Sequence, residues 1–377
     1  MGKENNMTPY IFTKEDTKLL KGGGIILMLA HHLWAFPERL ISDLPLTSMT
    51  PFGMQIAMYI GWYGKICVSL FMFLGGYGSY LLYKQKKFDY IEKIKSLYLS
   101  YWKVFAVFIP IGFLFFQRQS DYSANTAVCH VFDHYSISDF LANLTGIRTS
   151  YNGEWWFFFS YVVVLATFPI VVKIIEKGSF GINMWIVCVY EILVTYVFPT
   201  FQTDNYFPSL SRSWLYTMLV CQSAPWCASF WCGCVFAKDH MLERLKHNLD
   251  KAGLLNSFAA LAGILVTFFL RIYVVGEEAD IFYVPIICIY GTYLSNRVNV
   301  VKRCLLKLGE HSTSMWLIHS FLIYYFYGAA KFILGVRHVL LVLIILILNT
   351  YLLSCITNNF YLWIYKVVHS KNLQMKK

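Results

Sequence analysis

Apolar residues form long runs along this chain of 377 residues, and shorter polar segments separate the runs. Each run is close to the ~20 residues that a helix needs to cross a hydrocarbon core about 30 Å thick, because a helix rises about 1.5 Å per residue. The pattern predicts an all-α membrane protein, a polytopic bundle of about ten transmembrane helices with no soluble domain. The expected spans are roughly 19–37, 60–83, 97–117, 155–175, 182–201, 214–237, 253–273, 280–297, 312–333 and 336–365.

The order of these runs shows no internal repeat, and no Pro- or Ser-rich linker divides the chain. We therefore expect a single integral membrane domain over residues 1–377. Polar residues precede the first run, and no small-residue cleavage pattern follows it. The first run is therefore expected to remain as a transmembrane helix, because a removable signal peptide would carry such a cleavage site.

Composition agrees with this interpretation, since 57% of the residues are hydrophobic and only 14% are charged. The net charge of +11 would suit a nucleic-acid partner, but the distribution of Lys and Arg gives another explanation. If the N-terminus is inside, seven of the 32 basic residues fall in outer segments, Lys65 falls in the second run, and the other 24 are inside. This bias predicts that both termini are cytoplasmic, and no nucleic-acid partner is expected. The seven are Arg39, Arg118, Arg148, Arg212, Arg271, Lys331 and Arg337.

The ten cysteines fall almost entirely inside or beside apolar runs, where they are expected to be small core residues. A disulfide framework would need them in exposed loops, and only Cys129 lies clearly in one. Cys232 and Cys234 have no matching second pair, so no metal site is expected.

The first run holds the most informative ionisable residues, Lys21 and His32. Eleven residues of helix make about three turns plus 20°, so both side chains share one face and lie ~16 Å apart along the axis. His31 points about 80° away from that face. Ionisable groups at membrane depth are paired, interfacial or functional. On geometry alone, two hydrogen-bonded histidines near the outer interface are the slightly favoured interpretation, and a chemical role for His32 stays open.

Two further ionisable residues lie at helix positions where charge is costly. Glu154 opens the fourth run, where helix capping at the outer interface explains it fully, but a carboxylate at the level of His32 would also orient an imidazole. His319 lies too deep in the ninth run to anchor at an interface, so we expect it to face the bundle interior.

Three other segments have both structural and functional interpretations. The glycines at 22–24 allow close approach of a helix or of a ligand phosphate, and helix packing is favoured. The basic stretch KQKKFDYIEKIK (84–95) suits anionic lipid headgroups by default and a nucleotide's phosphates as the alternative. The longest outer segment, about 118–154, carries aromatic, Asp and His residues and is a candidate cap over a cavity.

Together these stretches resemble the membrane-bound acyltransferase-3 superfamily, ten-helix proteins that O-acylate sugars, often of cell-surface polysaccharides. Its hallmark is a basic residue, ten intervening residues and a histidine in the first helix, which resembles Lys21 and His32. Lys stands where Arg is common, and a triple glycine follows it. Three further stretches are similar to family signatures: CVSLFMFLGGYGSYLLYK (67–84), YNGEWWFFFSYVVVL (151–165) and LGEHSTSMWLIHSFL (308–322).

The resemblance implies an O-acetyltransferase of the plasma membrane, with acetyl-CoA as co-substrate and a hydroxyl of a cell-surface or exported polysaccharide as acceptor. Lys21, with Lys93 or Lys95, would then hold the phosphates of CoA, because Lys offers a compact charge with rotatable donors. Besides these two substrates, the lipid bilayer and a polysaccharide synthesis or export machinery are the implied partners.

The same resemblance implies catalysis by His32, either as a general base on the acceptor hydroxyl or as a nucleophile that carries the acyl group. We favour the base, because direct transfer needs one histidine only. Glu154 or His319 would orient it.

Three alternatives remain at this stage. Another short acyl group, such as succinyl, would suit the same acceptors, since the volume of the pocket decides between them. A lipid-linked oligosaccharide transporter or flippase also needs a polytopic bundle, although such folds usually show repeats. A non-catalytic scaffold predicts that His32, Glu154 and His319 are replaceable without loss of function.

Overall fold

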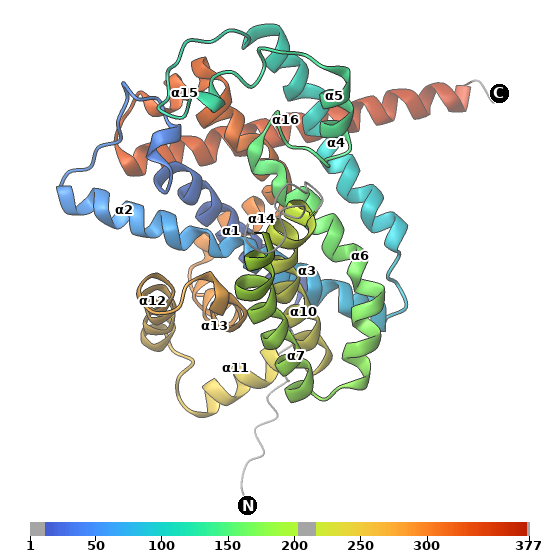
Figure 1. Ribbon diagram of the computed structural model, residues 1–377. Coiled ribbons are helices and arrows are strands. Elements are labelled where there is room, and N and C mark those ends of the chain that lie inside the picture. Colours follow the sequence, from blue (N-terminus) through green and yellow to red (C-terminus); the bar gives the residue numbers. More distant parts are fainter. Residues whose placement is uncertain (1–11, 203–215, 375–377) are drawn as a thin grey trace, which may run out of the picture. The chain divides into compact units, whose positions relative to one another are not determined.

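The structure is a computed structural model that describes residues 12–202 and 216–374, and within them each expected span contains a helix (Figure 1). The described residues form no β-sheet, so the chain is all-α as predicted. Four basic residues used in the charge count, Lys3, Arg212, Lys376 and Lys377, lie outside the described residues.

The helical elements follow one another in chain order with short connections. They are α1 (Lys14–Trp34), η1 (Pro37–Arg39), α2 (Pro51–Gly64), α3 (Ile66–Lys84), α4 (Tyr90–Phe115), η2 (Thr126–Val128), α5 (Ile137–Leu144), η3 (Gly153–Trp155), α6 (Trp156–Lys177), α7 (Phe180–Ile192), η4 (Leu193–Val197), η5 (Phe198–Gln202), η6 (Thr217–Ser223), α10 (Ala224–Lys238), α11 (Met241–Lys251), α12 (Ser257–Tyr273), η7 (Glu277–Ala279), α13 (Asp280–Ser295), α14 (Asn299–Ser320), η8 (Phe321–Tyr325), α15 (Tyr327–Leu334) and α16 (Val339–Gln374).

Length and apolarity identify six membrane spans among the described helices, and a bent pair brings the number to seven. The other three expected spans are present as α1, α12 and α13. Helices α12 and α13 are shorter than the other spans, with 17 and 16 residues. Helix α1 opens with a charged turn that contains Glu15 and Asp16. The protein is therefore a multi-pass membrane protein.

Helix α16 shows why the fold needs a bilayer. Large apolar side chains recur every four residues on it and are about half exposed, with Leu340 at 56%, Ile344 at 51% and Leu348 at 61%. Residues four apart share one helix face, so these side chains form a continuous apolar stripe. Contact of such a stripe with lipid is favourable, whereas its exposure to water would be unfavourable.

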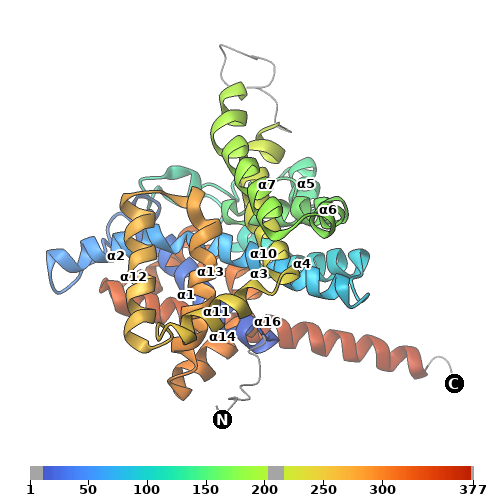
Figure 2. The same cartoon turned by 90° about the horizontal axis from the view of Figure 1, so that it is seen from below.

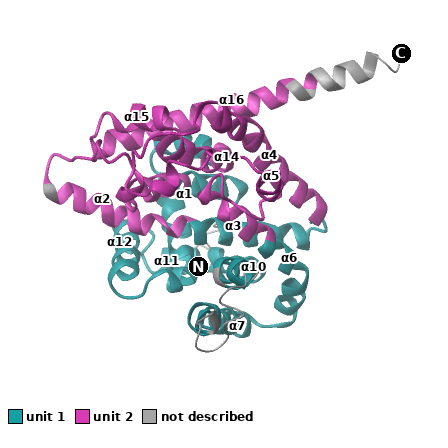
Figure 3. Ribbon diagram, turned by 45° about the horizontal axis from the view of Figure 1, so that its top comes forward, with its two compact units in different colours: residues 1–24, 68–88, 163–309 teal, residues 25–67, 89–162, 310–377 magenta. Residues whose placement is uncertain are grey.

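The described chain divides into two compact units, each assembled from three segments (Figure 3). Unit 1 comprises residues 1–24, 68–88 and 163–309, and unit 2 comprises residues 25–67, 89–162 and 310–377. Within unit 1, α12 and α13 pack side by side (Figure 1, Figure 2). A buried ion pair joins them, since Arg271 Nε lies 2.7 Å from Asp280 Oδ1. Ser69 of α3 donates to the other oxygen of Asp280 at 2.8 Å.

The glycines at 22–24 also belong to unit 1, and they differ in their surroundings. A Cβ on Gly22 would lie 2.1 Å from the carbonyl oxygen of Leu305, so α1 and α14 cross there with main chain against main chain. A Cβ on Gly23 would meet nothing within 4 Å. Helix packing therefore accounts for Gly22, as the sequence favoured, and it does not account for Gly23.

Unit 2 contains the end of α1, the helices α2, α4 and α5, and the chain from the second half of α14 onward. The helical rod Asn299–Tyr325 ends in a bend of 90° before α15. Phe326, at the bend, has extended φ and ψ of −107° and 93°. This bend and the end of α1 provide the residues of the candidate site.

Candidate active site

The two histidines at the end of α1 have different surroundings. Helix α1 stops at Trp34 because Pro37 follows closely, and Phe36 before it takes a non-helical φ of −130°. His31 is buried and donates from Nδ1 to the carbonyl of Gly61 at 2.8 Å, which makes it a structural contact. By contrast, no described residue hydrogen-bonds to the buried Nδ1 of His32.

His319 faces His32, with ring centroids 4.7 Å apart. It lies in the last turn of α14 and is fully buried, as predicted for a residue that faces the interior. Its Nδ1 lies 2.5 Å from the carbonyl oxygen of Trp316, and a carbonyl can only accept, so Nδ1 carries a hydrogen. In the neutral ring Nε2 is then a proton acceptor, and this buried atom has no partner among the described residues.

Glu154 lies in η3 and is buried, with 4% of its surface exposed. The side chain of Asn152 caps this turn, since it accepts from the Glu154 amide at 3.1 Å, so the carboxylate is not the cap. Instead, Arg39 Nη1 lies 2.6 Å from Oε1, and the Tyr325 hydroxyl lies 2.8 Å from Oε2. The amide of Gly153 donates to that hydroxyl at 2.9 Å, so Tyr325 must donate its own hydrogen to Glu154.

Tyr324 connects this ion pair to the histidines. Its hydroxyl donates to the main-chain carbonyl of His32, one of the carbonyls that the end of α1 leaves without a helical partner. The guanidinium carbon of Arg39 lies 4.3 Å from the centroid of the same tyrosine ring. Burial alone would lower the pKa of Arg39, but attraction to Glu154 outweighs it, so the pKa is raised and the group stays charged.

Two residues of the turn before α6 hydrogen-bond to α14. The side-chain Nδ2 of Asn152 donates to Ser320 Oγ at 2.7 Å, and that hydroxyl donates to the side-chain Oδ1 of the same Asn152 at 3.0 Å. Trp155 donates from Nε1 to the carbonyl of Leu317 at 3.0 Å. Glu154, between these anchors, is therefore held in place on both sides.

The predicted residues thus fall into two groups. His32, Glu154 and His319 all lie in unit 2, where Tyr324, Tyr325 and Arg39 connect them. Lys21 lies on α1 in unit 1, whereas Lys93 and Lys95 lie in the first turns of α4 in unit 2. A common phosphate site formed by these lysines remains a prediction.

Sequence reasoning missed the roles of Arg39, Tyr324 and Tyr325. Arg39 contributed only to the count of outer charges, and the two tyrosines lie just beyond the stretch 308–322 that was singled out. The available signal was Glu154 itself, because a buried carboxylate needs a cationic partner or several donors.

Comparison with protein families identifies a match. The acyltransferase-3 family model, described as an acyltransferase domain, matches residues 16–359 and so covers most of both units. Neither the curated proteins nor the solved structures contain a match to this chain.

Proposed function

Because the chain belongs to the acyltransferase-3 family of membrane enzymes, we propose that it moves an acetyl group from cytoplasmic acetyl-CoA to a polysaccharide hydroxyl. The acceptor would be a cell-surface or exported glycan, and the enzyme would act in the plasma membrane. Membership of an acyltransferase family makes the chain an enzyme, which argues against the flippase and the scaffold.

The pair of facing imidazoles is the observation that carries this proposal. Their rings lie 4.7 Å apart, and each has a buried ring nitrogen that no described residue satisfies, His32 Nδ1 and His319 Nε2. A buried polar atom without a partner costs about 1–3 kcal/mol, so two in one place favour a site that substrate or proton transfer completes.

The bonds suggest how the pair would work. The Trp316 carbonyl holds the hydrogen of His319 on Nδ1. The two rings are not hydrogen-bonded to each other in this structure, but if they turned toward each other His319 Nε2 would accept from a hydrogen on His32 Nδ1. This would leave the lone pair of His32 on Nε2, where it can take the proton of the acceptor hydroxyl as its oxygen attacks the thioester carbonyl. The tetrahedral intermediate then expels the CoA thiolate, which takes that proton back from His32.

Glu154 would support this reaction indirectly. Arg39 and Tyr325 hydrogen-bond to its two oxygens, so the carboxylate holds the position of Tyr325 and is not bonded to an imidazole. His319, and not Glu154, is then the orienting partner of His32.

The donor side follows from the predicted topology. With both termini in the cytoplasm, Lys21 would lie on the side where acetyl-CoA is available, and Lys93 and Lys95 would contribute further charge for its phosphates. A polysaccharide synthesis or export machinery would present the acceptor. Succinyl or another short acyl group would use the same chemistry in a pocket of different volume.

The test compares two neighbouring residues. His32→Ala should lower acetyl transfer by about 100-fold or more, because general-base catalysis contributes about 10²–10⁴-fold. His31→Ala should be milder, since His31 bonds the Gly61 carbonyl instead. Transfer of labelled acetyl from acetyl-CoA to glycan would be measured in membranes with matched expression, and the product checked by mass spectrometry. An active His32→Ala enzyme would end this mechanism.

A further inference from the structure

The break in the helix behind the candidate site leaves main-chain groups that need partners. The rod Asn299–Tyr325 stops at the 90° bend, and α15 begins again at Tyr327. The last carbonyls of one helix and the first amides of the next have no helical partners. Leaving such a buried group unpaired costs about 1–3 kcal/mol, so the bend needs other donors and acceptors.

Gln119 supplies the bend with one hydrogen-bond donor and one acceptor from the same side chain. Its Oε1 accepts from the amide of Tyr327 at 3.0 Å, and its Nε2 donates to the carbonyl of Tyr325 at 2.9 Å. The carboxamide therefore replaces a peptide group across the break at Phe326. Tyr122 adds a third bond, because its hydroxyl donates to the carbonyl of Tyr324 at 2.5 Å.

The same segment holds the turn that carries Arg39. The carbonyl of Glu38 accepts from Ser123 Oγ and from the amide of Asn125, each at 2.9 Å. The carbonyl of Tyr122 accepts from the amide of Ser42 at 2.8 Å. Residues 119–125 therefore bind the main chain beside both partners of Glu154, Arg39 and Tyr325.

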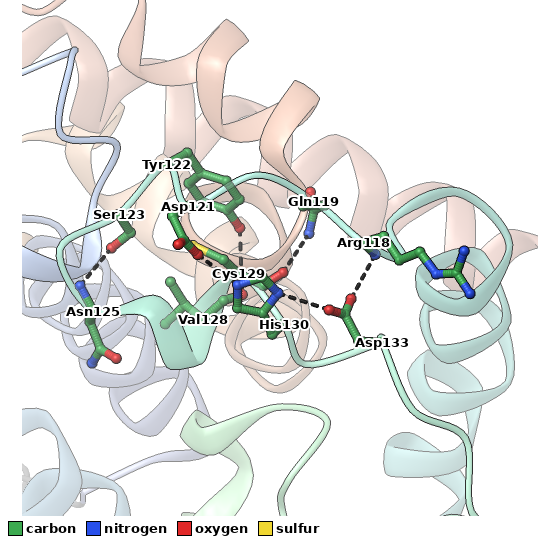
Figure 4. A network of polar contacts seen from close by, with 10 residues as sticks. All are labelled: Arg118, Gln119, Asp121, Tyr122, Ser123, Asn125, Val128, Cys129, His130 and Asp133. Atoms are coloured by element: carbon green, nitrogen blue, oxygen red, sulfur yellow. Dashed lines mark hydrogen bonds and ion pairs between the residues drawn. The ribbon is translucent and has the colours of Figure 1, made fainter.

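Hydrogen bonds within residues 118–133 fix the shape of the loop that contains residues 119–125 (Figure 4). His130 lies between two carboxylates, with Nε2 2.6 Å from Asp121 and Nδ1 2.8 Å from Asp133. The amide of Arg118 donates to Asp133 at 2.6 Å. The segment is thus closed at both ends and can act as a rigid support.

We infer that Gln119 and Tyr122 are positioning residues for acyl transfer, because they hold the broken helix at the angle that directs Tyr324 to His32 and Tyr325 to Glu154. This inference rests on the proposed function for its catalytic consequence. Its structural part, the bridging of the break, does not depend on which acyl group or acceptor the enzyme uses.

The kinetic experiment uses the full chain in nanodiscs. Gln119→Met keeps the size of the side chain and removes its donor and acceptor, and Tyr122→Phe removes one hydroxyl. We expect kcat per folded molecule to fall about 10- to 100-fold in Gln119→Met, and less in Tyr122→Phe, because small misplacements of site groups have effects of this order. The KM for acetyl-CoA should stay within about twofold, since donor binding is not changed.

The matched control is Tyr98→Phe. The Tyr98 hydroxyl also donates to a main-chain carbonyl of the outer segment, that of Thr145 at 2.9 Å, and its ring packs on Trp102 and Phe158. Its kcat should remain native. A loss of kcat in Tyr98→Phe as large as that in Gln119→Met would overturn the inference, as would a native kcat in Gln119→Met.

Gln119→Glu gives a test by rescue. A carboxylate can accept from the Tyr327 amide but cannot donate to the Tyr325 carbonyl, whereas a protonated carboxyl can do both. The kcat of Gln119→Glu relative to native should therefore rise as the pH falls from about 7.5 towards about 5. A ratio that is flat with pH would contradict the bridging role.

Hydrogen exchange separates this inference from the proposed function. In Gln119→Met the Tyr327 amide loses its acceptor, so deuterium uptake over residues 321–334 should rise at least fivefold in rate, and uptake over the same residues in Tyr98→Phe should not change. If native protein transfers no acetyl group, the proposed function has failed, yet faster exchange would still support the bridge. Unchanged exchange would overturn it whatever the activity.

Discussion

The ion pair between Arg39 and Glu154 allows a quantitative prediction. Glu154→Gln keeps the shape of the side chain and an oxygen that can accept from Tyr325, and it removes only the negative charge. Glu154 is 4% exposed and the Arg39 side chain 18%, so the guanidinium would lose its counter-charge in a mostly dry position. Removing one partner of a buried pair costs about 3–5 kcal/mol.

The expected value lies at the lower end of that range. Arg39 retains 18% exposure and lies over the Tyr324 ring, 4.3 Å from its centroid. A cation over an aromatic face is stabilised by about 0.5–2 kcal/mol, and this cation–π contact would remain after the carboxylate is neutralised. We therefore expect Glu154→Gln to lower the free energy of unfolding by about 3 kcal/mol.

The control is a second Arg–carboxylate ion pair that is more exposed to solvent. Arg148 and Asp139 form an ion pair with side-chain exposures of 54% and 34%. Exposed pairs contribute about 0–1 kcal/mol, so Asp139→Asn should lower the free energy of unfolding by less than about 1 kcal/mol. Both variants would be unfolded with denaturant in mixed micelles.

A double variant tests whether the unpaired charge of Arg39 causes the loss of stability in Glu154→Gln. Arg39→Met removes the cation, so Arg39→Met with Glu154→Gln should be less destabilised than the two single changes added together, by about 1 kcal/mol or more. Additive losses, or equal losses in Glu154→Gln and Asp139→Asn, would refute the argument from burial.

Two further predictions concern packing and pH. Gly22→Ala should lower the melting temperature sharply, because a Cβ there would lie 2.1 Å from main-chain oxygen of α14, whereas Gly23→Ala should be neutral or stabilising by up to about 1 kcal/mol; equal melting temperatures would contradict this. Hydrogen bonds to Asp121 and Asp133 raise the pKa of His130 above its ordinary 6.5. The stability that protonated His130 adds to the folded state is therefore fully present below pH 6.5 and is lost as the pH rises through the raised pKa. The difference in melting temperature between native protein and His130→Gln should therefore shrink between about pH 6 and pH 9, and a difference independent of pH would exclude this role.

The sequence predicted the helices well because apolar length is a strong signal. Each expected run contains a helix, and most differences lie at the ends, but the ninth run, 312–333, is interrupted by the 90° bend at Phe326. Helix α2 starts at Pro51, where the Thr50 side chain accepts from the Gly53 amide, and joins α3 into a rod of 33 residues. Helix α4 starts at Tyr90, where Asp89 accepts from the Glu92 amide. These caps were visible in the sequence, but an apolarity window does not register capping residues.

The candidate site was predictable only in part. The spacing of Lys21 and His32 favoured His32 over His31 as the candidate, which stays a prediction, and the depth of His319 predicted its burial. The partners of Glu154 were not predictable, because Tyr325 lies 171 positions away along the chain. Only the folded chain brings such residues together, and helical periodicity carries no information about contacts between distant helices.

The site also lies where periodicity is least informative, at the ends of helices. His32 precedes the end of α1 at Trp34, Glu154 lies in the turn before α6, and Tyr325 directly precedes the break at Phe326. Helix ends leave unpaired carbonyls and amides, and in a membrane other protein groups must satisfy them. Tyr324 does so for His32, and Gln119 does so across the break. The need to satisfy these groups connects the helix ends to one another, and those connections hold the residues of the candidate site in place.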